Sequence, residues 1–229
     1  WVWFSATTCH APEAYGQAWR NELHLKQQIQ LLALRMEWMK STNQKNLRIP
    51  KSTQAEEQHL KEMLRVDHAG ELGAVRIYDG QLAGLAFHPK SASTKRQIRH
   101  MHQQEKEHLA EFNQTLPARN VRPTALQPFW HVAGGSLGFA TAILGEKFAH
   151  ACTAAVETVI DHHYEEQIQL VRKEGDHKLA DTLKKFQAEE VEHKDLAISQ
   201  GAEDIPFYGM FRQVVELGCR TAIRLSEKI

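Results

Sequence analysis

Apolar residues recur every three or four positions along most of the chain, whereas the strict alternation typical of β-strands is scarce. A first apolar stripe predicts a helix from about residue 19 to 39, and the polar stretch 41–53 that follows is typical of a linker. Further helices are predicted over residues 56–87, 93–116, 146–173, 177–199 and 206–229, with Gly175 and Gly201 at positions where helices usually end. The pattern therefore predicts an all-α protein.

The chain also repeats internally. Glu105 precedes His108 by three residues, and Glu190 precedes His193 by the same spacing. A further glutamate lies upstream of each pair, Glu71 at 34 residues before Glu105 and Glu157 at 33 residues before Glu190. We therefore expect an N-terminal extension over residues 1–55 and one helical domain over residues 56–229, built from two copies of a unit, about 56–145 and 146–229.

The repeated glutamates and histidines have the spacing of metal ligands. Residues three apart project from one face of a helix, so each E-x-x-H pair could bind one cation. If four helices pack antiparallel, Glu71 and Glu157 project inward from the other two helices. Four carboxylates and two imidazoles would then surround one centre, as in di-iron and di-manganese carboxylate bundles. The predicted ligands are Glu71, Glu105, His108, Glu157, Glu190 and His193.

Charge and ligand type favour this interpretation. Burial of four unpaired carboxylates would cost several kcal/mol for each, whereas two divalent cations cancel their charge. Carboxylate oxygens with one imidazole per ion suit iron or manganese better than zinc, and the spacing does not choose between iron and manganese. The alternative is that all six residues form exposed ion pairs, which fits poorly with the small and apolar neighbours of Glu71 and Glu157.

The composition excludes other classes of protein. The 229 residues include 28 basic and 28 acidic side chains, so the formal net charge is zero and no basic tract suggests nucleic-acid binding. The three cysteines, Cys9, Cys152 and Cys219, are far apart, which argues against a disulfide framework or a zinc site and fits a reducing compartment. No G-x-G-x-x-G motif follows a strand, so we expect no dinucleotide-binding domain.

Several stretches resemble a known family. They are LRVDHAGELGAVRIYDGQL, QEKEHLAEF, VRPTALQPFW, ACTAAVETVIDHHYEEQI, AEEVEHKD and LGCRTAIRLSEKI. The resemblance runs from about residue 60 to residue 229. In these stretches the chain is similar to the demethoxyubiquinone hydroxylases of ubiquinone biosynthesis, whose six iron ligands fall on the six residues named above. The resemblance implies a ferritin-like di-iron four-helix bundle with two extra apolar or amphipathic helices.

The resemblance also implies an activity. Such enzymes are monooxygenases that hydroxylate the ring of a polyprenylated demethoxy-benzoquinol, using O₂, two iron ions per chain and electrons from NADH. They lie peripherally on the matrix side of the inner mitochondrial membrane or on the bacterial plasma membrane. The chain departs from the family at Arg224, where many members carry a tyrosine associated with electron delivery, so the route of the electrons stays open.

Other polar residues near the predicted ligands are candidates for supporting roles. His163 and Tyr164 follow Glu157 by six and seven residues, and the family pattern gives both a place beside the metal ligands. Tyr78 has the same spacing from Glu71 as Tyr164 has from Glu157. Asp67 and Asp161 each lie four residues from a predicted ligand glutamate, which leaves two alternatives: simple solvent exposure, or a hydrogen bond to a ligand histidine. Glu189 lies four residues before His193, but its counterpart in the first repeat is Gln104, so the shared element is E-x-x-H alone.

Two segments are expected to contact a membrane. Residues 123–145 carry no charged side chain, yet their four glycines and two prolines make a poor spanning helix, and residues 206–229 are amphipathic. We expect both to lie on the membrane and to admit a polyprenyl substrate, with packing against each other or another subunit as the alternative. A lipid-presenting protein of ubiquinone biosynthesis, or a larger complex, is the expected partner. Two other functions are considered: a di-iron quinol oxidase, and a structural or assembly subunit that retains the fold without turnover.

Overall fold

Every regular element is helical in the part of the chain described by this computed structural model, which is Gln30 and residues 54–229. The elements are α2 (Gln54–Gly84), η1 (Leu85–Phe87), α3 (Ala92–Ala118), α4 (Gln127–Ile143), α5 (Glu146–Lys173), α6 (His177–Ser199), η2 (Ala202–Asp204) and α7 (Tyr208–Lys228). The all-α prediction is confirmed. The helix expected at 19–39 and the linker at 41–53 lie outside the described residues, apart from Gln30, and the division at residue 55 stays a prediction.

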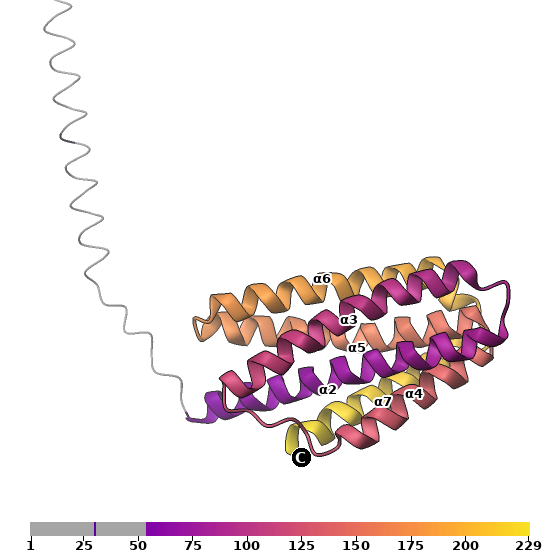
Figure 1. Cartoon of the computed structure of the whole chain (residues 1–229). Coiled ribbons are helices and arrows are strands. Elements are labelled where there is room, and N and C mark those ends of the chain that lie inside the picture. Colours follow the sequence, from indigo (N-terminus) through magenta and orange to yellow (C-terminus); the bar gives the residue numbers. More distant parts are fainter. Residues whose placement is uncertain (1–29, 31–53) are drawn as a thin grey trace, which may run out of the picture. The chain divides into compact units, whose positions relative to one another are not determined.

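Four long helices, α2, α3, α5 and α6, run alongside one another as a bundle (Figure 1). Helix α2 packs against α3, and α5 packs against α6, so each repeat contributes one antiparallel pair. Helix α4 lies along α2, and α7 lies against α5 and α2 on the same side of the bundle (Figure 1). The two extra helices of the prediction therefore cover the face that α2 and α5 present.

The turn between α5 and α6 illustrates how local sequence sets a helix boundary. Gly175 adopts a positive φ of 84°, which a residue without Cβ tolerates at a helix end. The carboxylate of Asp176 then accepts a hydrogen bond of 3.1 Å from the backbone N–H of Leu179 and caps the start of α6. Gly201 takes a φ of 85° after α6. Both glycines lie where the sequence predicted helix ends.

Helix α4 packs against α2 through glycine. A Cβ built on Gly138 would lie 1.9 Å from the carbonyl oxygen of Ile77, and one built on Gly80 would lie 2.1 Å from that of Gly135. The two backbones are therefore closer than any larger side chain allows. Gly134 and Gly138 of the uncharged stretch 123–145 thus serve helix packing. No helix in the described part of the chain is both long and apolar enough to cross a membrane.

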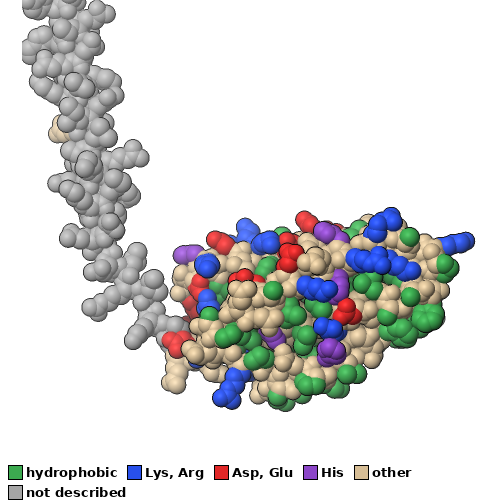
Figure 2. Space-filling model, in the orientation of Figure 1, with side chains coloured by type: hydrophobic (Ala, Val, Ile, Leu, Met, Phe, Trp, Pro, Cys, Tyr) green, Lys and Arg blue, Asp and Glu red, His purple; other side chains and the backbone are tan. Residues whose placement is uncertain are grey.

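The outer faces of α4 and α7 remain apolar. Large exposed side chains there include Phe129, Val132 and Ile143 on α4, and Met210, Val214 and Leu217 on α7, with Phe207 just before α7. Hydrophobic side chains reach the surface along the edge where these two helices run (Figure 2). Packing against α2 and α5 therefore accounts for only one side of each extra helix.

Two apolar clusters fill the bundle, one toward each end. One contains Leu64 of α2 and Phe112 of α3, and the other contains Tyr78 of α2 and Met101 of α3. Along both helices the predicted metal ligands fall between these cluster residues in the sequence. The bundle therefore holds the predicted metal ligands in a middle layer, between two apolar layers that exclude water.

Candidate metal centre

The structure brings together all six residues that the sequence predicted as metal ligands. Helix α2 contributes Glu71, α3 contributes Glu105 and His108, α5 contributes Glu157, and α6 contributes Glu190 and His193. Each is buried, with no more than 3% of its surface exposed. Their potential ligand atoms form two groups, within each of which all atoms lie within 4.8 Å of one another. One group contains Glu71 and His108, the other contains Glu157 and His193, and Glu105 and Glu190 belong to both.

The shared glutamates lie between the two histidines. The Nδ1 atom of His108 is 3.1 Å from Oε1 of Glu190 and 3.8 Å from Oε2 of Glu105. The Nδ1 atom of His193 is 3.1 Å from Oε1 of Glu105 and 3.2 Å from Oε2 of Glu190. Each shared carboxylate therefore presents one oxygen toward each histidine. This geometry suits two ions bridged by two carboxylates, with one further glutamate and one imidazole for each ion.

The unpaired atoms of the centre support the same interpretation. Among the buried side-chain atoms that have no hydrogen-bond partner are Oε2 of Glu71, Oε1 of Glu105, Nδ1 of His108 and Oε1 of Glu190. A buried polar atom without a partner is costly and requires an explanation. Cations bound at these atoms would supply the missing interactions. The residues present therefore fit the pair of metal ions that the fold implies.

Protons and cations would compete for these side chains. Burial raises the pKa of the Glu105 and Glu157 carboxyls well above the ordinary value, and the neighbouring Glu190 adds to this rise. Burial opposes charge on His108, but the nearby carboxylates of Glu190 and Glu71 outweigh it and raise the pKa of His108 to about 11. Burial likewise opposes charge on Glu190, whose pKa nonetheless falls to about 2 because the imidazoles of His108 and His193 face it. Metal binding at the centre must therefore displace protons.

Two tyrosines support the centre across the repeats. The hydroxyl of Tyr78 on α2 donates a hydrogen bond of 3.0 Å to Oε1 of Glu157 on α5. The hydroxyl of Tyr164 on α5 donates in turn to Oε1 of Glu71 on α2. Each tyrosine thus orients the glutamate of the opposite repeat. The prediction that Tyr164 lies beside the predicted ligands agrees with this contact, and simple helix-face packing does not describe either tyrosine.

The outward nitrogens of the two histidines bond to residues whose roles the sequence analysis did not assign. Nε2 of His108 lies 2.6 Å from a carboxylate oxygen of Glu189, and Nε2 of His193 lies 3.0 Å from the amide oxygen of Gln104. The hydrogen bond to a ligand histidine that was one alternative for Asp67 and Asp161 is not formed by either residue. The sequence did contain a signal for these two residues, because Gln104 and Glu189 occupy the same position in the two repeats, immediately before the glutamate of an E-x-x-H pair.

Asp67 and Asp161 have other partners. Asp67 lies 3.0 Å from Nε2 of His163 and accepts a hydrogen bond of 2.5 Å from Gln167. Asp161 forms an ion pair of 2.7 Å with Lys194. His163 therefore does not contact a predicted ligand directly. Its surroundings place it on the wall of the cavity described next.

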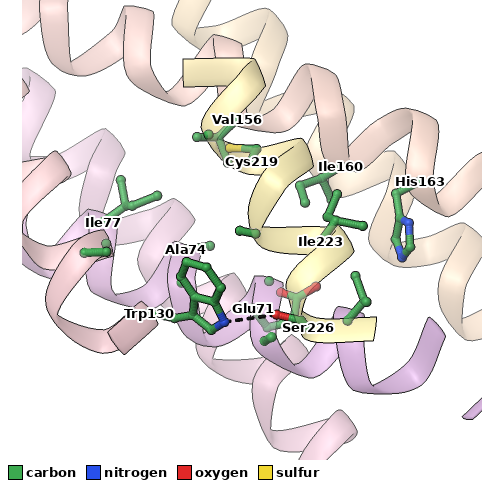
Figure 3. A pocket seen from close by; sticks show the side chains of 18 of the residues that line it. Glu71, Ala74, Ile77, Trp130, Val156, Ile160, His163, Cys219, Ile223 and Ser226 are labelled. Carbon is green, nitrogen blue, oxygen red and sulfur yellow. Dashed lines mark hydrogen bonds between the residues drawn. The ribbon is translucent and has the colours of Figure 1, made fainter. Parts of the chain in front are cut away.

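An apolar cavity of about 380 Å³ reaches the centre. It lies between α2, α4, α5 and α7, and its walls include Ile77, Val156, Ile160 and Ile223 (Figure 3). Trp130 of α4 donates a hydrogen bond of 3.0 Å to the hydroxyl of Ser226 on α7, which joins two walls (Figure 3). The polar residues that line the cavity include Glu71, Tyr164, Asp67 and His163. Glu71 belongs to both the cavity and the cluster of predicted ligands, so a molecule in the cavity is adjacent to the centre.

The sequence of this chain is similar to those of known proteins. The family model described as ubiquinone biosynthesis protein COQ7 matches residues 58–226. The chain is 43% identical over 199 residues to the "NADPH-dependent 3-demethoxyubiquinone 3-hydroxylase, mitochondrial" of Dictyostelium discoideum, and the matched region covers 83% of this chain and 90% of that protein. It is 47% identical over 170 residues to the protein of the same name from Bos taurus, covering 73% of this chain and 76% of that protein. It is 45% identical over 168 residues to the "3-demethoxyubiquinol 3-hydroxylase" of Rhodospirillum rubrum, covering 72% and 76%. The chain therefore belongs to the family of the ubiquinone biosynthesis protein COQ7.

Proposed function

We propose that this protein is a di-iron monooxygenase that hydroxylates the ring of a polyprenylated demethoxy-benzoquinol in ubiquinone biosynthesis. The observation that carries the proposal is the contact between an apolar cavity and a buried cluster of four carboxylates and two imidazoles, which share Glu71. The names of the relatives, which specify 3-demethoxyubiquinone or 3-demethoxyubiquinol as substrate, support the same reaction. Neither a quinol oxidase nor a subunit without turnover is favoured by these names.

The six predicted ligands would hold two iron ions. Glu71 and His108 would bind one ion, Glu157 and His193 the other, and Glu105 and Glu190 would bridge them. Bound iron would supply the reductive activation of O₂ that a ring hydroxylation requires. The protein's own contribution is to fix the carboxylates and to exclude water from the centre. Manganese also suits this ligand set, so metal analysis is part of the test.

The cavity walls suit a quinol with an apolar tail. Aliphatic side chains such as Ile77, Val156 and Ile223 remove the ring from water, and the cavity offers few polar groups to it. His163 is one of those groups, and its bond to Asp67 holds the imidazole in place. We assign to His163 a hydrogen bond with a quinol oxygen, and to Tyr164 the orientation of Glu71. Both roles suit residues beside the reacting ring rather than residues that bind metal.

The electron donor is a reduced nicotinamide nucleotide in this proposal. The family resemblance implies NADH, whereas the names of the mitochondrial relatives specify NADPH. Arg224 is exposed on α7, at the position where many family members carry a tyrosine. A guanidinium on the surface is a suitable contact for the phosphates of either nucleotide. Comparing NADH and NADPH in the same assay decides which one reduces the protein.

The apolar faces of α4 and α7 would dock on the surface of a membrane. Val214 lines the cavity and is also 66% exposed, so the cavity and the apolar face meet at this residue. A polyprenyl tail could therefore pass from lipid into the cavity without crossing water. We propose the matrix side of the inner mitochondrial membrane as the location, in line with the mitochondrial relatives, with the plasma membrane as the bacterial equivalent. A lipid-presenting protein would use the same face.

The test of function begins with the purified protein and added ferrous iron. We expect two iron ions per chain and conversion of a short-tailed demethoxyquinone to its hydroxylated product, dependent on O₂ and a nicotinamide nucleotide. Glu157→Ala should abolish turnover and lower the metal content. Glu166→Ala, which removes an exposed carboxylate from the same helix, should change neither.

The other outcomes separate the alternatives. Bound iron without product would favour a structural subunit, and reduction of O₂ to water by quinol would favour an oxidase. Unchanged metal content in the Glu157→Ala protein would contradict the ligand assignment.

Membrane docking has a separate test. The double variant Phe207→Ser, Met210→Ser should lose binding to vesicles of phosphatidylcholine and cardiolipin in a flotation assay. The control Ile198→Ser also removes an exposed apolar side chain, but from α6, and should retain binding. Equal binding by both variants would contradict the proposed docking face.

A further inference from the structure

The two halves of the centre differ in the charge of the group that faces the ligand histidine. The outward nitrogen of His108 faces the carboxylate of Glu189 at 2.6 Å, and that of His193 faces the neutral amide of Gln104 at 3.0 Å. Both partners occupy the same position of the repeat, immediately before the glutamate of E-x-x-H. Each partner comes from the opposite repeat, since Glu189 on α6 contacts His108 on α3, and Gln104 on α3 contacts His193 on α6. The internal symmetry therefore holds for the geometry but not for the charge.

The protonation of the two rings follows from this geometry. Each histidine points Nδ1 at the shared carboxylates, so a ligand bond to a cation forms through Nδ1 and the proton stays on Nε2. Nε2 then donates to Glu189 in one half and to Gln104 in the other. A hydrogen bond to a carboxylate is charge-assisted, and it makes the imidazole a stronger electron donor to metal than a bond to an amide does.

The hydrogen bonds that the tyrosines make to the two unshared glutamates are matched. Tyr164 donates to Glu71 in one half, and Tyr78 donates to Glu157 in the other. The aromatic neighbours differ, because Phe186 stacks on His108 with centroids 4.0 Å apart and Tyr78 meets His193 edge-on at 6.3 Å, but neither ring carries charge. Lys185 lies 3.5 Å from Glu189, and its side chain is 63% exposed, so water screens its charge. Glu189 is therefore the main electrostatic difference between the surroundings of the two histidines. The pair of Asp67 and His163 lies beside Glu71 and is unchanged in the Glu189 variants used below.

We propose that the two metal positions are unequal, and that the position formed by Glu71 and His108 binds a divalent cation more tightly and fills first because Glu189 hydrogen-bonds to His108. This proposal rests on the proposed function, in that it requires two metal positions. It adds a role for Glu189 and Gln104 as positioning residues that set the order of loading. Removal of such an outer partner typically costs about 10–100-fold in metal affinity.

Manganese(II) is the probe for the test, since electron paramagnetic resonance distinguishes one bound ion from a coupled pair. Protein stripped with a chelator is titrated with Mn(II) without O₂. In the wild type we expect the signal of a single bound ion first and the signal of a coupled pair as the second ion binds. The dissociation constants of the two steps should differ by about 10–100-fold.

Variants that delete one position identify which one fills first. Glu157→Ala should keep one ion with the tight dissociation constant, and Glu71→Ala should keep one ion with the weak constant. Glu189→Gln makes both outer partners amides, so the two constants should converge. Gln104→Glu makes both partners carboxylates and should tighten the second step. The control Glu192→Gln removes an exposed charge from the same helix and should leave both constants unchanged.

The outcomes distinguish this inference from the function on which it rests. Equal affinity of the Glu71→Ala and Glu157→Ala proteins, or an unchanged ratio in Glu189→Gln, would overturn the unequal positions and leave the di-metal centre intact. Wild-type protein that never shows a coupled pair would overturn both the inequality and the proposed di-metal function. Tightening of the second step in Gln104→Glu is a result that a purely structural role for this residue would not produce.

Discussion

Replacement of Gly138 by alanine tests the contact that holds α4 on the bundle. The added Cβ would lie 1.9 Å from the carbonyl oxygen and 2.8 Å from the carbonyl carbon of Ile77, both backbone atoms that cannot rotate away. Ordinary contact begins at 3.4 Å, so α4 must move away from α2 by about 1.5 Å, the difference between 3.4 and 1.9. Such a shift loosens the contacts that neighbouring residues make across the same interface.

The expected cost follows from two opposing effects. Overpacking of a close contact typically costs about 1–3 kcal/mol. Alanine is favoured over glycine within a helix by about 0.5–1 kcal/mol, which offsets part of that cost. The net loss is therefore about 0–2.5 kcal/mol in the free energy of unfolding. For a chain of this size, about 2–4 °C of melting temperature corresponds to each kcal/mol, so Tm should fall by up to about 10 °C.

Circular dichroism of the melting transition, at equal metal content, measures this change. Gly218→Ala on α7 is the matched control, because a Cβ there meets nothing within 4 Å and only the helix preference remains. Its Tm should rise by about 1–4 °C. Since α4 forms one wall of the cavity, Gly138→Ala should also raise KM for the quinone. A Gly138→Ala protein that melts as high as the Gly218→Ala protein would refute the close-packing argument.

Three further predictions concern titration and reactivity. Because burial raises the pKa of Glu105 and Glu157, Mn(II) binding should release protons and strengthen with rising pH, as calorimetry in two buffers would show. Burial opposes charge on His163, but the hydrogen bond to Asp67 raises the pKa of His163 above 6.5. The protonated imidazole therefore stabilises the folded protein fully below pH 6.5, and this stabilisation is lost as the pH rises through the raised pKa. His163→Gln should therefore lower stability more in acid than in alkali, measured by urea unfolding. Burial raises the pKa of the Cys152 thiol to about 12, so iodoacetamide should label it only after unfolding, as mass spectrometry would show.

The periodicity of the chain predicted helices that the structure shows within residues 54–229, and it placed each E-x-x-H pair on one helix face. Helical spacing is a local property, and E-x-x-H places two ligands on one face whatever the helix packs against. Burial supplied the rest of that prediction. Four glutamates in otherwise small or apolar surroundings are costly unless they meet cations, so Glu71 and Glu157 had to converge with the two E-x-x-H pairs.

Tertiary structure alone decided which residues bond to the two ligand histidines. Asp67 was one candidate and bonds to His163 instead, whereas Glu189 bonds to the histidine of the first repeat and Gln104 to that of the second. These contacts join different helices, so they depend on how each helix is rotated and how closely two helices approach. Spacing within one helix carries no information on either quantity. The cavity also depends on tertiary structure, because its walls come from four helices. Their separation is set by contacts between helices, such as the close approach of Gly138 to the backbone of Ile77.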